Sequence, residues 1–175
     1  MENNKSIISD LFYGTNCNIS QYGGCSTKLF NYETYFFMIF PLEKVHKFKN
    51  NCNKQFINYN ITNNNEVSLY DCFDYDRKIE ENSMYCNFCK NMYESSFCTN
   101  LVILPQILII LLNRGRGNVF NIKCNFTEDL NLNNYCEFNN PPSNYKLIGV
   151  ITHIGDVCEW IFYCLLSGPS DSKMV

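Results

Sequence analysis

Cys86 and Cys89 are the residues whose spacing is best suited to chemistry. Two intervening residues allow both thiolates to bind one tetrahedral ion, while the amides between them turn toward the sulfur atoms. One such pair supplies half of a zinc site, so two more ligands must come from elsewhere in the chain. The second pair is incomplete, because Cys25 precedes a long aromatic stretch but the residue three positions before it is Tyr22.

Cys17 is the candidate for the fourth ligand. It can reach the other three if the segment before Cys25 loops back, which the Gly23-Gly24 pair would permit. We therefore expect a structural zinc site formed by Cys25, Cys86, Cys89 and Cys17. The alternative is that these thiols pack at the tip of a sheet without a metal. Since a thiol must lose its proton to bind zinc, this alternative predicts no proton release when zinc is added.

The sequence holds two histidines that could act as bases, His46 and His153. His46 lies in a charged stretch with Glu43 and Lys44, so we expect it to be solvated. His153 lies in an apolar stretch rich in β-branched residues, where a structural role is expected. Neither histidine is predicted to be catalytic.

Composition limits the class of protein. With 175 residues, of which 46% are hydrophobic and 15% aromatic, the chain is long and apolar enough to bury a core as one domain. The net charge is -3 and the basic residues are scattered, so no nucleic-acid partner is expected. The apolar run from Leu101 to Leu112 is broken by Pro105 and is too short to cross a bilayer, so no membrane partner is expected. Eleven cysteines without a signal peptide indicate a reducing compartment, the cytoplasm or the nucleus or both.

Periodicity and turn residues predict a mixture of helices and strands. Ser6–Gly14 is expected to be a short helix or the approach to a strand, and Thr15–Thr27 a turn-forming stretch. Lys28–Leu42 is expected to be a long strand, and the Asn-rich segment Asn50–Asn65 a solvated insertion or a long hairpin tip. Val67–Glu80 is predicted to be a helix with Ser68 as its N-cap. The remaining strands are predicted in the segments Leu101–Leu104, Gln106–Leu112, Val119–Phe126, Tyr145–Ile154 and Trp160–Leu166.

An ordered series of motifs resembles the catalytic domain of the ubiquitin-specific proteases. The series covers nearly the whole chain and consists of LFYG at Leu11–Gly14, FFMIFPLE at Phe36–Glu43, SLYDCFDY at Ser68–Tyr75, YCNFC at Tyr85–Cys89, LPQILIILLNR at Leu104–Arg114 and YKLIGVITHIG at Tyr145–Gly155. The resemblance implies an α+β, papain-like cysteine protease fold present in part, with antiparallel β-rich fingers and palm and the thumb missing. Residues 1–175 would then form one partial domain, with the fingers and a degenerate zinc ribbon at about 8–100 and the palm at about 101–175.

The same resemblance implies a cysteine-type deubiquitinase, a ubiquitin carboxyl-terminal hydrolase that needs no cofactor beyond the structural zinc. No segment matches the family's nucleophile box, which resembles GNTCYMN. The histidine box, which resembles SGHFIAYC, is occupied by CEWIFYC at Cys158–Cys164, so Glu159 stands where the general base belongs. A carboxylate with a pKa near 4.3 is a poor base for a thiol at neutral pH. We therefore expect no catalytic residues in this chain, which would be a fragment or a decayed copy.

Two other functions compete with that interpretation. The first is an inactive ubiquitin-binding or scaffolding module, whose partners would be ubiquitin or ubiquitinated proteins. Phe12 and Tyr13 are the candidate ubiquitin contacts, by their place in the first motif. The second is a small zinc-ribbon protein that binds nucleic acid, against which the negative charge argues.

Overall fold

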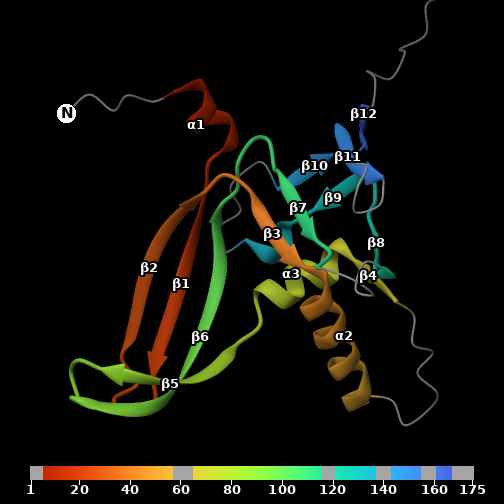
Figure 1. Ribbon diagram of the computed structural model, residues 1–175. Coiled ribbons are helices and arrows are strands. Elements are labelled where there is room, and N and C mark those ends of the chain that lie inside the picture. Colours follow the sequence, from red (N-terminus) through yellow and green to blue (C-terminus); the bar gives the residue numbers. More distant parts are fainter. Residues whose placement is uncertain (1–5, 57–64, 116–120, 137–142, 155–160, 167–175) are drawn as a thin grey trace, which may run out of the picture.

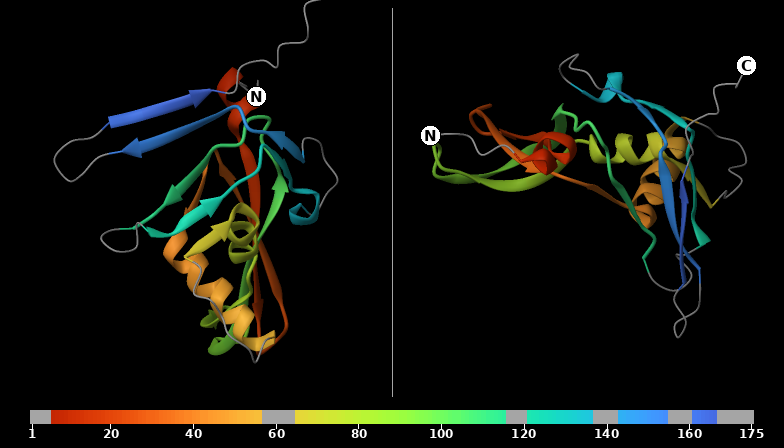
Figure 2. Two further views of the ribbon diagram at one scale, coloured as in Figure 1. Left: turned by 90° about the vertical axis from the view of Figure 1, so that its right-hand side faces the viewer. Right: turned by 90° about the horizontal axis from the view of Figure 1, so that it is seen from above.

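A long sheet projects from a body of helices and short strand pairs (Figures 1 and 2). The computed structural model describes residues 6–56, 65–115, 121–136, 143–154 and 161–166. Helix α1 (Ile7–Phe12) precedes the first strand of the sheet and lies at its upper end in Figure 1. The view from above shows the sheet extending to one side of the body, so the two parts meet over a limited junction (Figure 2).

The projecting sheet consists of β1 (Gly14–Tyr22), β2 (Lys28–Tyr35), β5 (Glu80–Cys86) and β6 (Asn91–Ile103). Its strands are antiparallel in the order β2-β1-β6-β5. Two hairpins therefore lie side by side, and their inner strands pair from Tyr22 with Ser95 to Thr15 with Ile103. Both hairpin turns lie at the far end of the sheet, which brings residues 23–27 and 87–90 together.

The body contains two helices, α2 (Leu42–Phe56) and α3 (Leu69–Asp76), among the described residues. Strand β3 (Met38–Pro41) runs parallel to β7 (Ile110–Asn113), and β4 (Glu66–Ser68) runs parallel to β8 (Lys123–Asn125). Strands β9 (Asp129–Asn131) and β10 (Asn144–Lys146) form an antiparallel pair, as do β11 (Gly149–Ile154) and β12 (Ile161–Leu166). A 3-10 turn at Asn133–Tyr135 follows β9.

The core lies where α2 and α3 meet the strands of the body. Phe40 and Phe73 are each 1% exposed and their rings are in edge contact, with centroids 5.1 Å apart. Leu42 and Val45, three residues apart in α2, are fully buried against the same cluster. Each such side chain contributes about 1.5–3 kcal/mol by leaving water. Strands β3 and β4 and helices α2 and α3 therefore pack with the C-terminal part of the chain, although strands of the projecting sheet precede and follow them.

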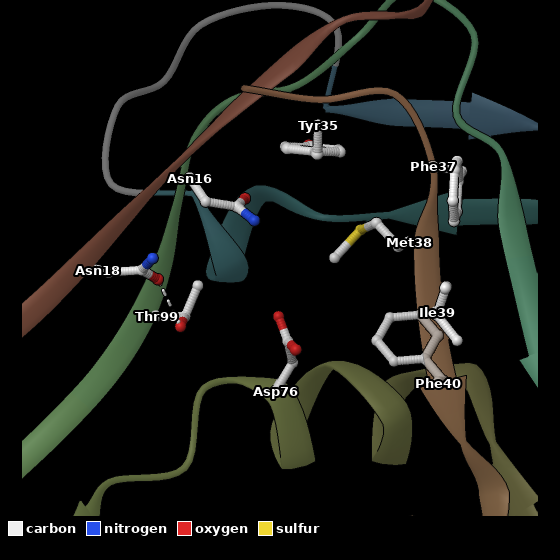
Figure 3. A pocket seen from close by; sticks show the side chains of 9 residues that line it. All are labelled: Asn16, Asn18, Tyr35, Phe37, Met38, Ile39, Phe40, Asp76 and Thr99. Carbon is white, nitrogen blue, oxygen red and sulfur yellow. Dashed lines mark hydrogen bonds between the residues drawn. The ribbon is translucent and has the colours of Figure 1, made fainter. Parts of the chain in front are cut away.

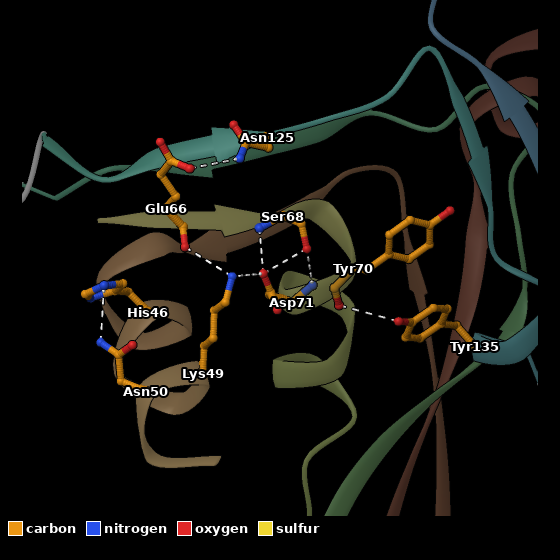
Figure 4. A network of polar contacts seen from close by, with 9 residues as sticks. All are labelled: His46, Lys49, Asn50, Glu66, Ser68, Tyr70, Asp71, Asn125 and Tyr135. Atoms are coloured by element: carbon orange, nitrogen blue, oxygen red, sulfur yellow. Dashed lines mark hydrogen bonds and ion pairs between the residues drawn. The ribbon is translucent and has the colours of Figure 1, made fainter. Parts of the chain in front are cut away.

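Helix α3 begins at a reciprocal cap. The Ser68 hydroxyl accepts a hydrogen bond from the Asp71 amide at 3.1 Å, and the Asp71 carboxylate accepts one from the Ser68 amide at 2.6 Å. Lys49 of α2 donates to the same carboxylate at 2.9 Å (Figure 4). Burial alone would raise the pKa of Asp71, but the hydrogen bonds from Lys49 and Ser68 outweigh it and hold that pKa below its ordinary value.

Of the two alternatives for the N-terminal segment, the structure shows the helix, and the Ser68 N-cap is confirmed. Most of the predicted turn at 15–27 is strand β1, because residues 15–22 are held between two partner strands. The predicted strand Lys28–Leu42 is two strands separated at Phe36–Phe37, and it ends where α2 begins. The Asn-rich segment is helical up to Phe56, since Leu42 and Val45 anchor a helix whose other faces are polar.

Of the later predicted strands, β7 begins only at Ile110 and β8 covers only Lys123–Asn125. Leu104 and Pro105 are buried all the same, so these apolar residues fill the core without joining a sheet.

Candidate functional site

Three of the four predicted zinc ligands meet at the far end of the projecting sheet. Cys25 lies in the β1–β2 turn, Cys86 ends β5 and Cys89 lies in the β5–β6 turn. Their sulfur atoms all lie within 4.8 Å of one another, and those of Cys25 and Cys86 are 3.6 Å apart. Two thiolates on a tetrahedral zinc ion are about 3.8 Å apart at Zn–S distances of about 2.3 Å, so this spacing fits such an ion.

The backbone around Cys86 has the form that a metal knuckle needs. The Cys89 amide points at the Cys86 sulfur at 3.5 Å, and the Lys90 amide donates to the Cys86 carbonyl at 2.8 Å. Lys90 closes the turn with a positive φ of 55°. On the facing hairpin, a side chain on Gly23 would collide with the Glu94 carbonyl, so glycine allows that turn to lie against β6.

The exposed Cys25 thiol is more acidic than the Cys89 thiol. Hydrogen bonding with the side chain and the backbone of Thr27 lowers the pKa of Cys25 to about 7. The contact with Cys25, followed by burial, raises the pKa of Cys89 to about 11. Cys25 therefore carries much of the negative charge of the group at neutral pH, and a bound cation would favour loss of the remaining protons.

Cys17 does not join this group. It is 1% exposed in the middle of β1, where it pairs with Tyr32 and Asn100. Five residues of extended strand separate it from Tyr22, a distance of about 17 Å. The segment before Cys25 does not loop back as the sequence suggested, because β1 and β2 pair continuously up to Gln21 and Lys28. The donor set within the described residues is therefore three thiols.

The structure describes only some of the two histidines and the residue at the histidine-box position. His46 is half-buried in α2, and its Nε2 atom lies 3.2 Å from the Asn50 side-chain amide, so it is not freely solvated as expected (Figure 4). His153 forms a backbone pair with Phe162 in β11–β12, but its side chain lies outside the described residues. Glu159 lies outside them as well.

Tyr13 belongs to an exposed aromatic group at the base of the projecting sheet. Its side chain is 46% exposed, and its ring centroid lies 6.3 Å from that of Phe36, which is 53% exposed. Phe36 in turn contacts Phe37 edge to face at 4.4 Å. Phe12 is half-buried on α1. The contribution of Phe36 and Phe37 was not foreseen, since they seemed to lie in the middle of one strand.

No helix in the described ranges is both long and apolar enough to cross a membrane.

Comparison with known proteins identifies the family. The sequence matches the family model for ubiquitin carboxyl-terminal hydrolase over residues 1–171. None of the curated proteins compared with the chain matches it. Three solved structures share the fold. The yeast SAGA DUB module with an Sgf73 mutant gives a TM-score of 0.71 at 19% identity, covering 94% of this chain and 35% of that chain.

The SAGA DUB module of Ubp8, Sgf11, Sus1 and Sgf73 bound to ubiquitin aldehyde gives a TM-score of 0.68 at 17% identity and covers 97% of this chain. The same module with a Ubp8 mutant, bound to monoubiquitin, gives 0.68 at 20% identity and covers 96%. The chain spans 36% of the length of each of these two relatives. These matches confirm the predicted α+β, papain-like fold. The chain therefore belongs to the ubiquitin carboxyl-terminal hydrolase family, a family of deubiquitinases.

Proposed function

We propose that this chain supplies the ubiquitin-holding part of a deubiquitinase, with the projecting sheet as fingers and the body as palm. The observation that carries the proposal is an aromatic group at the junction of the two parts of this fold. Tyr13 and Phe36 are exposed, and the half-buried Phe37 packs against Phe36. Aromatic side chains that are exposed in the free protein and cluster together are typical of protein-binding surfaces. In two solved structures of the same fold, the Ubp8-containing module is bound to ubiquitin aldehyde and to monoubiquitin.

The proposal includes that this chain alone does not cleave isopeptide bonds. Cysteine proteases need a thiolate within hydrogen-bond reach of a histidine that takes and returns the proton. In this sequence Glu159 occupies the place of that histidine, and a carboxylate cannot form the imidazolium that stabilises a thiolate. Binding of ubiquitin requires only the surface. An inactive ubiquitin-binding module would use the same residues, so it is the second candidate.

We also propose that Cys25, Cys86 and Cys89 hold a zinc ion at the tip of the fingers. The support is the fit of the three sulfur atoms and the thiolate character of Cys25. A water molecule or another small ligand would fill the fourth position, since zinc prefers four ligands. The ion would cross-link the two hairpins at their free end.

Titration of isotope-labelled ubiquitin with the full chain tests the binding proposal. We expect Phe36→Ala to weaken binding about tenfold, because a central aromatic contact is worth at least 1.4 kcal/mol. Phe126→Ala is the matched control, because it removes the same kind of ring from an exposed site. Phe126 is 48% exposed and lies in the loop between β8 and β9. Wild-type chain that leaves the ubiquitin spectrum unchanged would refute the proposal.

A ubiquitin derivative with a C-terminal electrophile tests the catalytic part separately. We expect no covalent adduct with the chain, whereas a complete deubiquitinase is labelled under the same conditions. An adduct on any of its cysteines would show that the chain carries a reactive nucleophile and that the incompleteness proposal is wrong.

A further inference from the structure

A cavity of about 230 Å³ lies at the junction of the projecting sheet and the body. Asn16 and Asn18 of β1 and Thr99 of β6 line its sheet side (Figure 3). Asp76, the last residue of α3, faces them from the body. Tyr35, Phe37 and the first three residues of β3 complete the lining. The polar residues of the lining lie outside the family motifs, so those motifs did not indicate a cavity.

The polar side of this cavity contains a buried acceptor without a hydrogen-bond partner among the described residues. Asn18 is satisfied, because its side-chain oxygen accepts a hydrogen bond from the Thr99 hydroxyl at 2.9 Å. The side-chain oxygen of Asn16 is buried and has no hydrogen-bond partner among the described residues. The Asp76 carboxylate points into the same space, and burial raises its pKa. An unpaired buried acceptor costs about 1–3 kcal/mol, and more when the group is charged.

The chain's own neighbouring cations are engaged elsewhere. Arg77 donates to the Asn134 carbonyl and lies over the Tyr135 ring. Lys78 forms an ion pair with Glu80 at 2.7 Å and lies over the Tyr75 ring. Asp76 also stands at the C-terminal end of α3, where the helix dipole adds negative potential. The site therefore attracts a cation that these residues do not supply.

The other side of the cavity is apolar. Met38 and Phe40 are buried there, and Phe37 and Ile39 extend the apolar wall toward solvent. The volume is below the range of about 300–1,000 Å³ that is typical of small-molecule pockets. It is nevertheless several times the roughly 30 Å³ that one water molecule occupies in the liquid. An elongated group with an apolar stem and a charged head fits these dimensions better than a metabolite or a single ion.

We propose that this cavity receives a lysine or arginine side chain of the protein that the fingers and palm hold. The methylene stem would lie along Met38 and Ile39, while the cationic head would donate to Asp76 and to the free oxygen of Asn16. Long basic side chains combine an apolar stem and a charged head in this way. The partner's identity as ubiquitin rests on the proposed function, but the chemistry of the cavity does not. The cavity would fix the orientation of the bound protein, because one basic residue must align with it.

Titration of the full labelled chain with n-butylammonium tests the cavity directly. We expect shifts of the side-chain amide signals of Asn16 and Asn18 that saturate with butylammonium and are absent with butanol. Asp76→Asn should weaken this binding at least about tenfold, because a charge-assisted hydrogen bond is lost. Asp129→Asn changes the net charge equally at an exposed site and should have no effect. Absence of the shifts in the wild type, or equal shifts in Asp76→Asn, would overturn the proposal.

A double-mutant cycle with ubiquitin tests the choice of partner. Ubiquitin variants in which single Lys or Arg residues are replaced by Met are titrated against the wild-type chain and against Asp76→Asn. We expect one ubiquitin variant to bind the two chains equally, with every other variant about tenfold weaker on Asp76→Asn. If ubiquitin fails to bind at all while butylammonium still binds, the proposed function fails and the cavity stands. If ubiquitin binds but no variant couples to Asp76, ubiquitin is not the source of the cation.

Discussion

The cap of α3 gives a prediction whose size follows from the structure. Asp71→Ala removes the hydrogen bonds that the carboxylate accepts from Ser68 and the ion pair with Lys49. Ser68 still caps the helix through the backbone amide of residue 71, so losing the hydrogen bonds to the carboxylate costs about 1 kcal/mol. The ion pair adds about 0.5 kcal/mol after screening, since its side chains are 34% and 22% exposed. We expect a total of about 1.5 kcal/mol, or a fall of about 3–6 °C in the melting temperature for a chain of this length.

Urea unfolding followed by far-ultraviolet circular dichroism measures the loss. Lys49→Met is the comparison variant, because it leaves the cap but removes the ion pair and the hydrogen bond to the Glu66 carbonyl, so it should cost about 1 kcal/mol. The double variant should cost less than the sum of the two single variants, since both single changes break one shared contact. A loss below about 0.5 kcal/mol for Asp71→Ala would refute the view that this cap holds α3 against α2.

The pH dependence of the same contact has a defined sign. The pKa of Asp71 is depressed in the folded protein relative to about 3.9 in an unfolded chain. Its stabilising effect is therefore fully present above about pH 5 and is lost as the pH falls below the unfolded value toward the folded one. The difference in unfolding free energy between the wild type and Asp71→Asn should shrink as the pH falls from 5 to 3. A difference that grows over this range would contradict the assignment.

Two further predictions concern the core and the fingertip. Phe40→Ala should destabilise the chain by about 3–5 kcal/mol in urea unfolding, because the Phe40 ring is 1% exposed and packs against Phe73. A loss below about 1 kcal/mol would mean that the core is packed differently. Zinc added to the metal-free chain should release protons, and calorimetry in buffers of different ionisation enthalpy measures that release. Cys86→Ser should abolish the release, whereas Cys17→Ser should not. Equal effects of the two serine variants would refute the three-thiol site.

The sequence predicted those features that depend on contacts between residues close together in the chain. The knuckle at Cys86 and Cys89 and the N-cap at Ser68 depend on contacts over three residues, so spacing alone predicted both. The assignment of Cys17 depended on how the chain before Cys25 turns, and pairing with two distant strands decided that instead. Local patterns do not specify such pairing, because the same extended segment can pair with its neighbours in different registers.

The cavity and the aromatic group were beyond sequence reasoning for a related reason. Asn16 and Asp76 lie on different elements, and only the packing of α3 beneath the projecting sheet brings them to one space (Figure 3). Helix α2 was missed because its second half is rich in Asn and Lys, which mask the two buried residues that anchor it. Tertiary burial outweighs weak helix propensity in such a segment.

The central pairing of the projecting sheet has a consequence for synthesis on the ribosome. Asn18 and Thr99, joined across β1 and β6, are 81 residues apart in the sequence. The first hairpin is translated long before its partner, so β1 must wait with an open edge until β6 has left the exit tunnel. High sequence separation of this kind slows folding. A nascent chain stalled before β6 should therefore engage chaperones that recognise unpaired strands, and it should release them once that strand emerges.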